Sequence, residues 1–273
     1  MTGAVLIVGR GFIGSTLAAA MAGSDARLVG HDAIHEPGLL RGVATVLHAG
    51  RDPALGTAAW SLAEDAELAL ARHAAGARLA FLSLGTRKVY APSTRPMTET
   101  DRVGPVDLYG QQKLALEHAL AELLGPRLTR LRLANIFGYE RDPARSSFLT
   151  AALAGLAERD EIRFDISPFV ARDFLPVELC AKALAGIARR PPGGVLNVGS
   201  GIALPAGRLA LWLIEGYGRG RLVIESPLEH DSFVLDIGRL KSLLGGAGCT
   251  PAELRQSCIA LGRRLRDEIA APR

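Results

Sequence analysis

Residues 4–14 read Ala-Val-Leu-Ile-Val-Gly-Arg-Gly-Phe-Ile-Gly, and an Ala-rich stretch follows as far as Ala22. The apolar run predicts a buried strand, and the stretch after the last glycine predicts a helix. Three glycines at this spacing between a strand and a helix are typical of the loop that binds the phosphates of a dinucleotide. Gly9 permits the tight turn, Gly11 lets the backbone approach the pyrophosphate, and Gly14 lets the helix pack against the strand. The alternative is a plain strand-to-helix turn in a chain rich in alanine and glycine.

The positions around this loop indicate which dinucleotide it binds. Phe12 and Ile13 fill the variable positions of the loop, so we expect them beside the cofactor as well. Asp32 lies 18 residues after the last glycine, just beyond the apolar pair Leu28-Val29. A carboxylate at that place bonds both ribose hydroxyls and repels a 2′-phosphate. The sequence therefore predicts NAD(H) and disfavours NADP(H), the alternative being that Asp32 is an exposed loop acid without this role.

Short β-branched runs alternate with Ala/Leu-rich stretches through the first half of the chain. The expected strands are 4–8, 27–29, 45–48, 78–82 and 129–133, and the expected helices are 13–22, 58–75 and 108–124. This order predicts an α/β fold, a Rossmann-type doubly wound parallel sheet with helices on both faces. We expect residues 1–138 to form an NAD-binding domain, to which part of 174–200 returns, and residues 139–273 to form a smaller C-terminal substrate-binding subdomain.

Composition narrows the class of protein. The chain has 273 residues, of which 48% are hydrophobic, so it can bury a large core. Its 32 basic and 28 acidic residues are interspersed, so nucleic acid is not an expected partner. The three cysteines lack the spacing of a metal or redox motif, which predicts no metal site and a reducing, cytoplasmic location. No apolar stretch reaches membrane-spanning length, so we expect no membrane contact.

A threonine, a tyrosine and a lysine follow the expected strand at 78–82. Thr86 ends the stretch Ser-Leu-Gly-Thr, and Tyr109 and Lys113 stand four residues apart on one face of the helix expected at 108–124. A free phenol has a pKa of about 10, and a neighbouring ammonium favours its ionised form. Tyr109 is therefore a candidate general acid and base, with Thr86 holding the same substrate oxygen and Lys113 also holding the nicotinamide ribose. The alternative is a surface helix that carries both residues by coincidence.

Seven short segments carry a wider pattern. They are Gly9-Arg-Gly-Phe-Ile-Gly14, Val46-Leu-His-Ala-Gly50, Thr86-Arg-Lys-Val-Tyr90, Tyr109-Gly-Gln-Gln-Lys113, Arg132-Leu-Ala-Asn-Ile-Phe-Gly138, Arg172-Asp-Phe-Leu-Pro-Val177 and Asn197-Val-Gly-Ser-Gly201. With these segments in this order, nearly the whole chain resembles the extended short-chain dehydrogenases/reductases, the group of nucleotide-sugar epimerases, dehydratases and 4-keto-sugar reductases. The resemblance implies that Thr86, Tyr109 and Lys113 are catalytic. It also implies that Asn135 lies near the substrate and that Arg172 meets the substrate's diphosphate.

Both substrate residues have structural alternatives. In the structural alternative, the side chain of Asn135 holds the end of a strand to a loop by hydrogen bonds, and Arg172 forms an ion pair with Asp173 or another acid. Neither alternative involves a ligand.

The sequence departs from the family pattern at three places. Only thirteen residues separate Asp32 from Val46, so one strand-helix unit is shortened or absent there. Thr86 is followed by Arg87-Lys88, where the resemblance to the family's dehydratases would require an Asp-Glu pair that eliminates water. Neither basic side chain is an acid/base group at neutral pH, so dehydration is disfavoured. The segment 225–231 also lacks the arginine that the resemblance implies as a second diphosphate ligand.

Together these observations predict an NAD(H)-dependent oxidoreductase or epimerase that acts on a secondary alcohol or ketone of a sugar-like substrate, with or without an attached nucleotide. The two enzyme classes expected are a 4-epimerase and a net ketone reductase. The alternative is a non-catalytic dinucleotide-binding sensor or scaffold, because a fold does not determine a function.

The helices expected at 58–75 and 108–124 carry apolar residues on more than one face. In the second helix these are Leu114, Leu116, Leu120 and Leu123. One face covers the sheet, and we expect the other to form a four-helix contact in a homodimer. The alternative is that the smaller subdomain or the C-terminal helix covers it.

Overall fold

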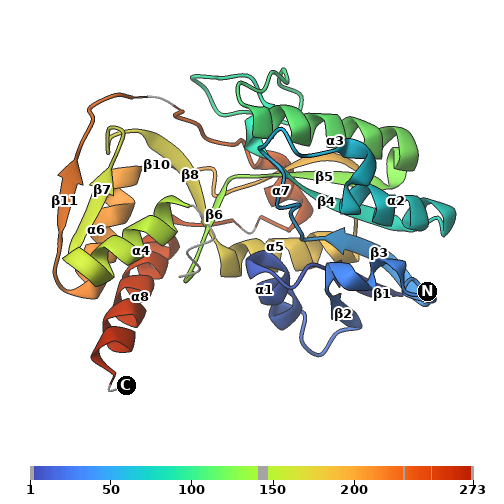
Figure 1. Ribbon diagram of the computed structural model, residues 1–273, viewed down its shortest axis with the longest axis horizontal. Helices are drawn as coiled ribbons and strands as arrows, with labels where there is room; N and C mark the ends of the chain where they lie inside the picture. The colour runs from blue at the N-terminus through green and yellow to red at the C-terminus, as the bar shows by residue number, and fades with distance from the viewer. Residues whose placement is uncertain (1–2, 141–146, 230, 247, 272–273) are drawn as a thin grey trace.

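The computed structural model describes residues 3–140, 147–229, 231–246 and 248–271. Its largest feature is a six-stranded sheet with the order β2-β1-β3-β4-β5-β9 (Figure 1). The strands are β1 (Ala4–Val8), β2 (Ala26–Val29), β3 (Val43–His48), β4 (Ala80–Thr86), β5 (Leu128–Leu133) and β9 (Gly194–Val198). All neighbouring pairs run parallel, so the carboxyl ends of the strands meet at one edge. The predicted α/β fold of Rossmann type is confirmed.

Helices cover both faces of this sheet (Figure 1). They are α1 (Phe12–Ala20) and α5 (Val177–Arg189) on one face, and α2 (Ala66–Gly76) and α3 (Leu108–Leu124) on the other. Because successive side chains of a strand point to opposite faces, Ile7 packs with α1 and α5 while Leu6 packs with α2 and α3. Both are fully buried, and burying each stabilises the fold by roughly 1.5–3 kcal/mol.

The predicted helix at 58–75 begins only at Ala66, so the prediction was wrong for its first turns. Asp65 caps α2 by accepting hydrogen bonds from the backbone N–H groups of Glu67 and Leu68 at 2.9 and 3.3 Å. Upstream there is only the short 3-10 turn η2 (Leu62–Glu64). The side chain of Gln112 binds the backbone of Gly56 and Thr57, both at 2.7 Å, and holds that part of the chain as a loop against α3.

The connection from β2 to β3 is short. It contains the 3-10 helix η1 (His31–His35) and turns, with no strand among these described residues. The strand-helix unit expected to be shortened or absent after Asp32 is therefore absent, and β2 forms the edge of the sheet.

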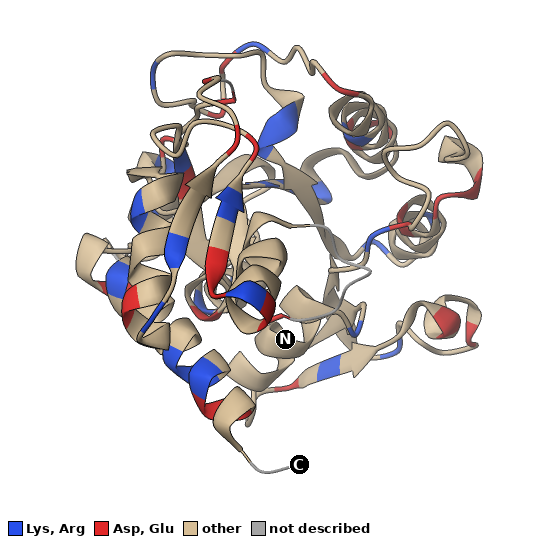
Figure 2. Ribbon diagram, turned by 60° about the vertical axis from the view of Figure 1, so that its left-hand side comes forward, with Lys and Arg blue, Asp and Glu red and all other residues tan. Residues whose placement is uncertain are grey.

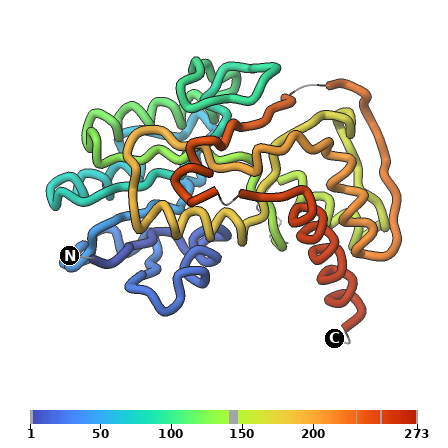
Figure 3. Tube along the Cα trace, turned by 180° about the vertical axis from the view of Figure 1, so that it is seen from behind, coloured from blue at the N-terminus to red at the C-terminus, as the bar shows by residue number. Residues whose placement is uncertain are grey.

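Most of the chain beyond β5, apart from α5, β9 and the segment around α7 (Gly238–Leu243), builds a second, smaller core (Figure 3). Its strands are β6 (Asn135–Phe137), β8 (Ala171–Pro176) and β10 (Ala203–Pro205) in one sheet, and β7 (Glu161–Phe164) and β11 (Arg221–Ile224) in another. Its helices are α4 (Phe148–Arg159), α6 (Ala206–Tyr217) and α8 (Pro251–Ala270), with α6 and α8 side by side in Figures 1 and 3. The remaining short helices are η3 (Arg87–Val89), η4 (Gly125–Arg127) and α7 (Gly238–Leu243).

One buried carboxylate joins the two cores. Asp173 of β8 accepts hydrogen bonds from the backbone N–H and hydroxyl of Ser200 at 2.8 and 2.7 Å, from Gly201 N at 3.1 Å and from Leu235 N at 3.2 Å. It links β8 to the chain that leaves β9 and to the segment before α7. Asp173 is thus engaged by these donors rather than by Arg172.

Charges of both signs are spread over the surface. Figure 2 shows the Lys and Arg positions interspersed with Asp and Glu along the helices and loops. Within the described part of the chain, no helix has the length and apolarity to span a membrane. Nor does any group of three or more His, Cys, Asp or Glu side chains there lie close enough together to hold a metal ion.

Candidate active site

The phosphate loop, residues 9–14, is shaped by backbone contacts that only glycine permits. Gly9 has a φ of +120°, and a Cβ there would lie 2.7 Å from Gly50 N. A Cβ at Gly14 would lie 1.9 Å from the carbonyl oxygen of Gly9. The start of α1 therefore packs directly on the turn after β1, as the glycine pattern predicted.

The N-terminus of α1 is open to an anion. Gly11 occupies the N-cap position with no side chain bonded to the helix N–H groups, and such groups favour negative charge. The ring of Phe12 covers Gly138, and Ile13 packs against the core under the sheet. A cleft of about 440 Å³ opens here between the loop and Val177. The free N–H groups and the glycine cradle fit the pyrophosphate of a dinucleotide.

Asp32 lies close to this loop. It is exposed in η1 and folds back over Gly30, where a Cβ would lie 2.1 Å from Asp32 Oδ1. The guanidinium of Arg10 is 3.6 Å from the same point. The carboxylate of Asp32 and the guanidinium of Arg10 therefore flank the end of β2. The carboxylate would repel a 2′-phosphate, and the guanidinium would attract it.

The end of β4 and the start of α3 meet closely. Thr86 is the last residue of β4, and its Oγ1 accepts a hydrogen bond from Lys88 N at 3.3 Å. Asp107 caps α3 by accepting from Gly110 N at 2.7 Å and pairs with Lys88 Nζ at 2.6 Å. A Cβ at Gly110 would lie 2.5 Å from Lys88 O, so the helix starts directly against η3. We call Thr86, Tyr109 and Lys113, the three residues predicted to be catalytic, the catalytic junction.

Tyr109 lies in the first turn of α3 and is half-buried. The guanidinium of Arg51 is 5.2 Å from the centre of its ring, and Lys88 Nζ is 5.9 Å from that centre. The loop that carries Arg51 is anchored by its hydrogen bond to Leu55 O at 2.9 Å and packs with Gly56 against the tyrosine. Two cations thus flank the phenol.

Lys113 is 4% exposed and is held inside the protein. Its Nζ donates to Leu84 O of β4 at 3.1 Å and lies 3.7 Å from Glu67 Oε2. Glu67 in turn lies 3.3 Å from His48 Nδ1. Burial raises the pKa of Glu67, but the charges of His48 and Lys113 outweigh burial and lower it to about 2. Glu67 is therefore ionised and balances the buried charge of Lys113.

A pocket of about 90 Å³ lies at this carboxylate, and Glu67, His48, Lys113 and Arg51 are among its lining residues. Glu67 Oε1 and His48 Nε2 are buried and have no hydrogen-bond partner among the described residues. His31 stacks on His48 with ring centres 5.2 Å apart. Burial, together with the charge of His48, lowers the pKa of His31.

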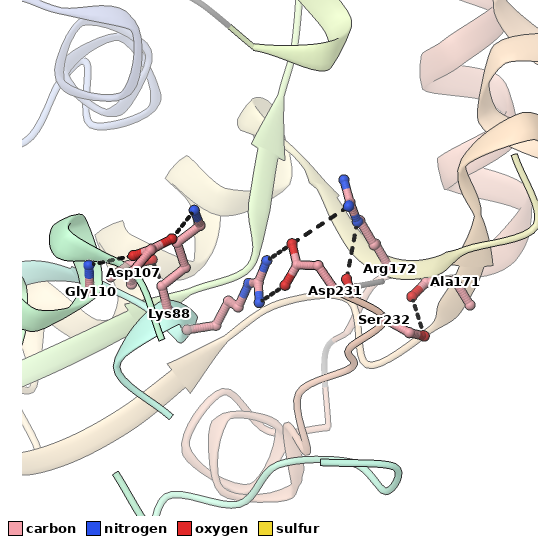
Figure 4. A network of polar contacts seen from close by, with 9 residues as sticks. Lys88, Asp107, Gly110, Ala171, Arg172, Asp231 and Ser232 are labelled. Atoms are coloured by element: carbon pink, nitrogen blue, oxygen red, sulfur yellow. Dashed lines mark hydrogen bonds and ion pairs between the residues drawn. The ribbon is translucent and has the colours of Figure 1, made fainter. Parts of the chain in front are cut away.

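The two predicted substrate residues lie in the small sheet. Asn135 starts β6, is half-buried and stands opposite Phe174 of β8. Arg172 of β8 donates from Nε to Asp231 O at 3.1 Å, and its Nη2 lies 3.5 Å from Asp231 Oδ2 (Figure 4). Arg87 binds both carboxylate oxygens of the same aspartate, each at 2.5 Å. The ion pair of Arg172 is thus made with Asp231.

Sequence reasoning missed three residues of this region. Glu67 lies in no motif, and the only signal for it is an acid on the inward face of a helix. The sequence marks Arg87 only as a basic residue where the resemblance to dehydratases would require an acid, and its partner Asp231 lies 144 residues away. No spacing rule connects such distant positions.

Comparison with known proteins shows which family the chain belongs to. Residues 42–199 match the family model described as NAD dependent epimerase/dehydratase family. No curated protein matches. Among solved structures the chain is similar to MoeE5 in complex with UDP-glucuronic acid and NAD, with 22% identity and a TM-score of 0.79 over 96% of this chain and 99% of that one.

Two further solved structures have the same fold. A variant of UDP-glucuronic acid 4-epimerase from Bacillus cereus, in complex with UDP-4-deoxy-4-fluoro-glucuronic acid and NAD, has 18% identity and a TM-score of 0.79, covering 97% of this chain and 99% of that one. RMD from Pseudomonas aeruginosa, complexed with NADPH, has 20% identity and a TM-score of 0.79 with the same coverage. At such identities these structures establish the fold alone.

The family match covers more than half of the chain and contains the whole catalytic junction. Because the family is NAD-dependent, the predicted cofactor NAD is confirmed, and so is the predicted resemblance to a family of epimerases and dehydratases. The chain belongs to the NAD dependent epimerase/dehydratase family.

Proposed function

We propose that this chain catalyses oxidation or reduction at a secondary alcohol or ketone carbon of a nucleotide-linked sugar, with Tyr109 as the acid and base. The observation that carries the proposal is the position of α3, which starts against the end of β4 at the sheet edge that also bears the phosphate loop. The names of the similar solved structures, which include UDP-sugar enzymes, support the substrate class.

The residues of the catalytic junction have separate tasks in this proposal. Bound NAD(H) supplies a hydride acceptor or donor. Tyr109 transfers the proton of the reacting hydroxyl. Thr86 already accepts a hydrogen bond from Lys88 N, so its own O–H is free to donate to the substrate oxygen. Lys113 places a buried positive charge on the same helix face as Tyr109 and holds the nicotinamide ribose with an N–H that Leu84 does not use.

Within this chemistry we favour a 4-epimerase or a net ketone reductase over a dehydratase. Elimination of water needs an acid and a base beside the catalytic threonine. The two residues after Thr86 are Arg87 and Lys88, which are paired with Asp231 and Asp107. Similar solved structures include a 5,6-dehydratase as well as epimerases, so the choice depends on these side chains.

Tyr109→Phe tests the proposal. We expect at least about a hundredfold loss of turnover with NADH affinity unchanged, because only the proton-transferring hydroxyl is removed. Turnover is measured with NADH and a panel of keto-sugars and with UDP-sugars for epimerisation, and affinity by NADH fluorescence. Tyr217→Phe, in the small core, is the matched control and should keep wild-type turnover. Equal turnover of the Tyr109 variant contradicts the proposal, and a wild type that binds NADH without any turnover would favour the alternative of a non-catalytic sensor or scaffold.

We further propose a homodimer through α2 and α3. The structure corrects the residues involved: Leu116 and Leu120 are buried between α3 and the sheet, so they do not belong to a second face. Leu114 and Leu123 are partly exposed and remain available. Light scattering should give a dimer mass that Leu114→Glu reduces to a monomer mass, and a wild-type monomer at micromolar concentration would contradict the proposal.

A further inference from the structure

A line of buried ionisable side chains leads away from the catalytic junction. Lys113 Nζ lies 3.7 Å from Glu67 Oε2, and the same oxygen lies 3.3 Å from His48 Nδ1. Both distances are slightly longer than a hydrogen bond, and such contacts commonly tighten during a reaction. Glu67 and His48, which we call the buried pair, are 2% and 3% exposed. The proposed function gives a task to Lys113 but none to the buried pair.

The buried pair has atoms that no protein group satisfies. Glu67 Oε1 and His48 Nε2 have no hydrogen-bond partner among the described residues. A buried polar atom without a partner costs roughly 1–3 kcal/mol of stability. Both residues line the pocket of about 90 Å³, which is several times the roughly 10–15 Å³ that one water molecule needs. These atoms therefore fit hydrogen bonds to water in the pocket.

The pocket connects the buried pair with the protein surface. His31, Arg51 and Pro53 line it as well, and all three are exposed. The other charged side chains of the lining have contacts elsewhere: Arg51 donates to Leu55 O, Asp52 accepts from Ala54 N, and Asp65 caps α2. The buried pair is thus the part of the lining that reaches from the pocket to Lys113.

The affinity of Glu67 for a proton depends on its neighbours. Burial raises the pKa of Glu67, whereas the charges of His48 and Lys113 and hydrogen bonds with His48 and Ser83 lower it to about 2. When Lys113 gives up a proton, one of the two charges that lower this pKa disappears. Glu67 then accepts a proton from His48 more readily and can pass it on to the neutral amine of Lys113.

We propose that the catalytic junction exchanges protons with solvent through the buried pair. In the direction of reduction, Tyr109 gives its proton to the substrate oxygen and takes one back from Lys113, which lies on the same face of α3. Glu67 passes a proton from His48 Nδ1 to Lys113, and His48 takes up a proton at Nε2 from water in the pocket. One proton thus enters from solvent for each proton that reaches the substrate.

This inference rests on the proposed function and favours one form of it, the net ketone reductase. Reduction of a carbonyl group by NADH consumes one proton from solvent in every turnover. A 4-epimerase instead returns the proton of the hydroxyl group to the same oxygen within one cycle. Only the reductase needs a path to solvent each time it turns over.

The test follows the proton of Tyr109 without any substrate. Full-length protein is mixed with NAD⁺ in a stopped-flow instrument, and the near-ultraviolet absorbance of tyrosinate reports the loss of the phenol proton. The positive charge of the nicotinamide in NAD⁺ favours the phenolate, so a proton has to leave the junction. We expect a tyrosinate signal in the wild type that Tyr109→Phe abolishes.

His48→Ala should give the same final signal at a rate at least about tenfold lower, because the path is interrupted while Tyr109 and Lys113 remain. Imidazole added to the solution should restore the rate, since it fits the space left by the ring and carries a proton. Pyrazole has the same shape but is too weak a base to carry a proton at neutral pH, so it should not restore the rate. A merely structural role of His48 predicts equal rescue by both compounds.

Two further variants complete the test. His48→Gln keeps a polar side chain at the buried position and carries no proton, so it replaces His48→Ala if the smaller side chain prevents folding, and it should show the same low rate. His118→Ala is the matched control, because His118 is an exposed histidine of α3 on the far side from the buried face of Lys113. It should leave both the size and the rate of the signal unchanged.

Four outcomes would overturn the inference: a wild type without the signal, a signal that persists in Tyr109→Phe, a wild-type rate in the His48 variants, or equal rescue by pyrazole. Its failure is distinguishable from failure of the proposed function. If the signals behave as expected but no keto-sugar or UDP-sugar is turned over, only the proposed function is contradicted. If Tyr109→Phe abolishes turnover while the His48 variants keep the wild-type rate of the signal, only the inference is contradicted.

Discussion

The phosphate loop and the ion pairs that Arg87 and Arg172 make with Asp231 lie near the same edge of the large sheet, but backbone groups form the first and charged side chains form the second. The loop is shaped by backbone contacts, with Gly14 against Gly9 and Gly9 against Gly50, and a Cβ at Gly9 or Gly14 would collide with backbone atoms. The ion pairs join charged side chains from the distant positions 87, 172 and 231. The loop therefore tolerates no side chain at Gly9 or Gly14, whereas a single substitution can remove one charge from the ion pairs.

This difference follows from the groups that form each region. Backbone N–H groups at a helix N-terminus are fixed by the fold and bind any phosphate placed there. Side-chain charges are placed individually, and each substitution shifts affinity by an amount set by burial and pairing.

The largest effect should come from a single methyl group in the phosphate loop. In Gly14→Ala the Cβ would lie 1.9 Å from Gly9 O, and both groups are backbone, so no rotamer relieves the contact. We expect destabilisation of roughly 3 kcal/mol, the upper end for overpacking, and loss of NADH binding by at least about a hundredfold. Thermal melting and NADH fluorescence measure the two effects.

Gly76→Ala is the matched control for that substitution. Gly76 ends α2, and a Cβ there meets nothing within 4 Å, so alanine should stabilise the protein by about 0.5–1 kcal/mol. Wild-type NADH affinity in Gly14→Ala would show that the loop does not depend on this close packing.

The same contrast explains what the sequence predicted. Gly9, Gly14 and the start of α1 follow one another in the chain, so a local pattern was enough to predict them, and the alternation of strands and helices predicted the sheet. The spacing of Tyr109 and Lys113 likewise lies within one helix. The partners Glu67 and Asp231 come from other segments, and only the folded chain brings them to Lys113 and Arg87.

The next effect concerns the buried charge of Glu67, which is 2% exposed. Its folded pKa of about 2 lies below the ordinary 4.5, so ionised Glu67 stabilises the protein above pH 4.5 by roughly 3 kcal/mol. That stability is lost as the pH falls from about 4.5 to about 2. Glu67→Gln should remove this part of the pH dependence and destabilise the protein at neutral pH, as measured by urea unfolding at several pH values.

The exposed Glu122 on α3 provides the comparison for Glu67. Glu122→Gln should leave the unfolding free energy and its pH dependence unchanged within about 0.5 kcal/mol. Parallel curves for wild type and Glu67→Gln between pH 2 and pH 4.5 would contradict the role of Glu67 as the partner of Lys113.

A substitution of Asp32 tests how a charge beside the phosphate loop affects the choice between NADH and NADPH. The carboxylate folds back over Gly30 and Arg10 lies beside the same position, so removing the negative charge leaves the cation alone. Asp32→Asn should shift the ratio of NADH to NADPH affinity toward NADPH by about tenfold, or about 1.4 kcal/mol. Titration calorimetry with both cofactors measures the ratio, and Arg10→Gln in the same background should reverse the shift. A wild type that prefers NADPH would mean that Asp32 does not contact the ribose.

The smallest expected effect on stability concerns Asp107, which both caps α3 and forms an ion pair with Lys88. This residue accepts from Gly110 N and also pairs with Lys88, and both charged side chains are 40% exposed. Asp107→Ala removes cap and pair and should cost about 1 kcal/mol, with a few-fold loss of turnover because Tyr109 lies in the first turn of α3. Asp107→Asn keeps a capping oxygen and should cost less than about 0.5 kcal/mol, the usual worth of an exposed ion pair. If urea unfolding gives equal costs for the two variants, the charge rather than the cap holds the start of α3, and the backbone that carries Tyr109 then depends on charge, as the ion pairs of Asp231 do.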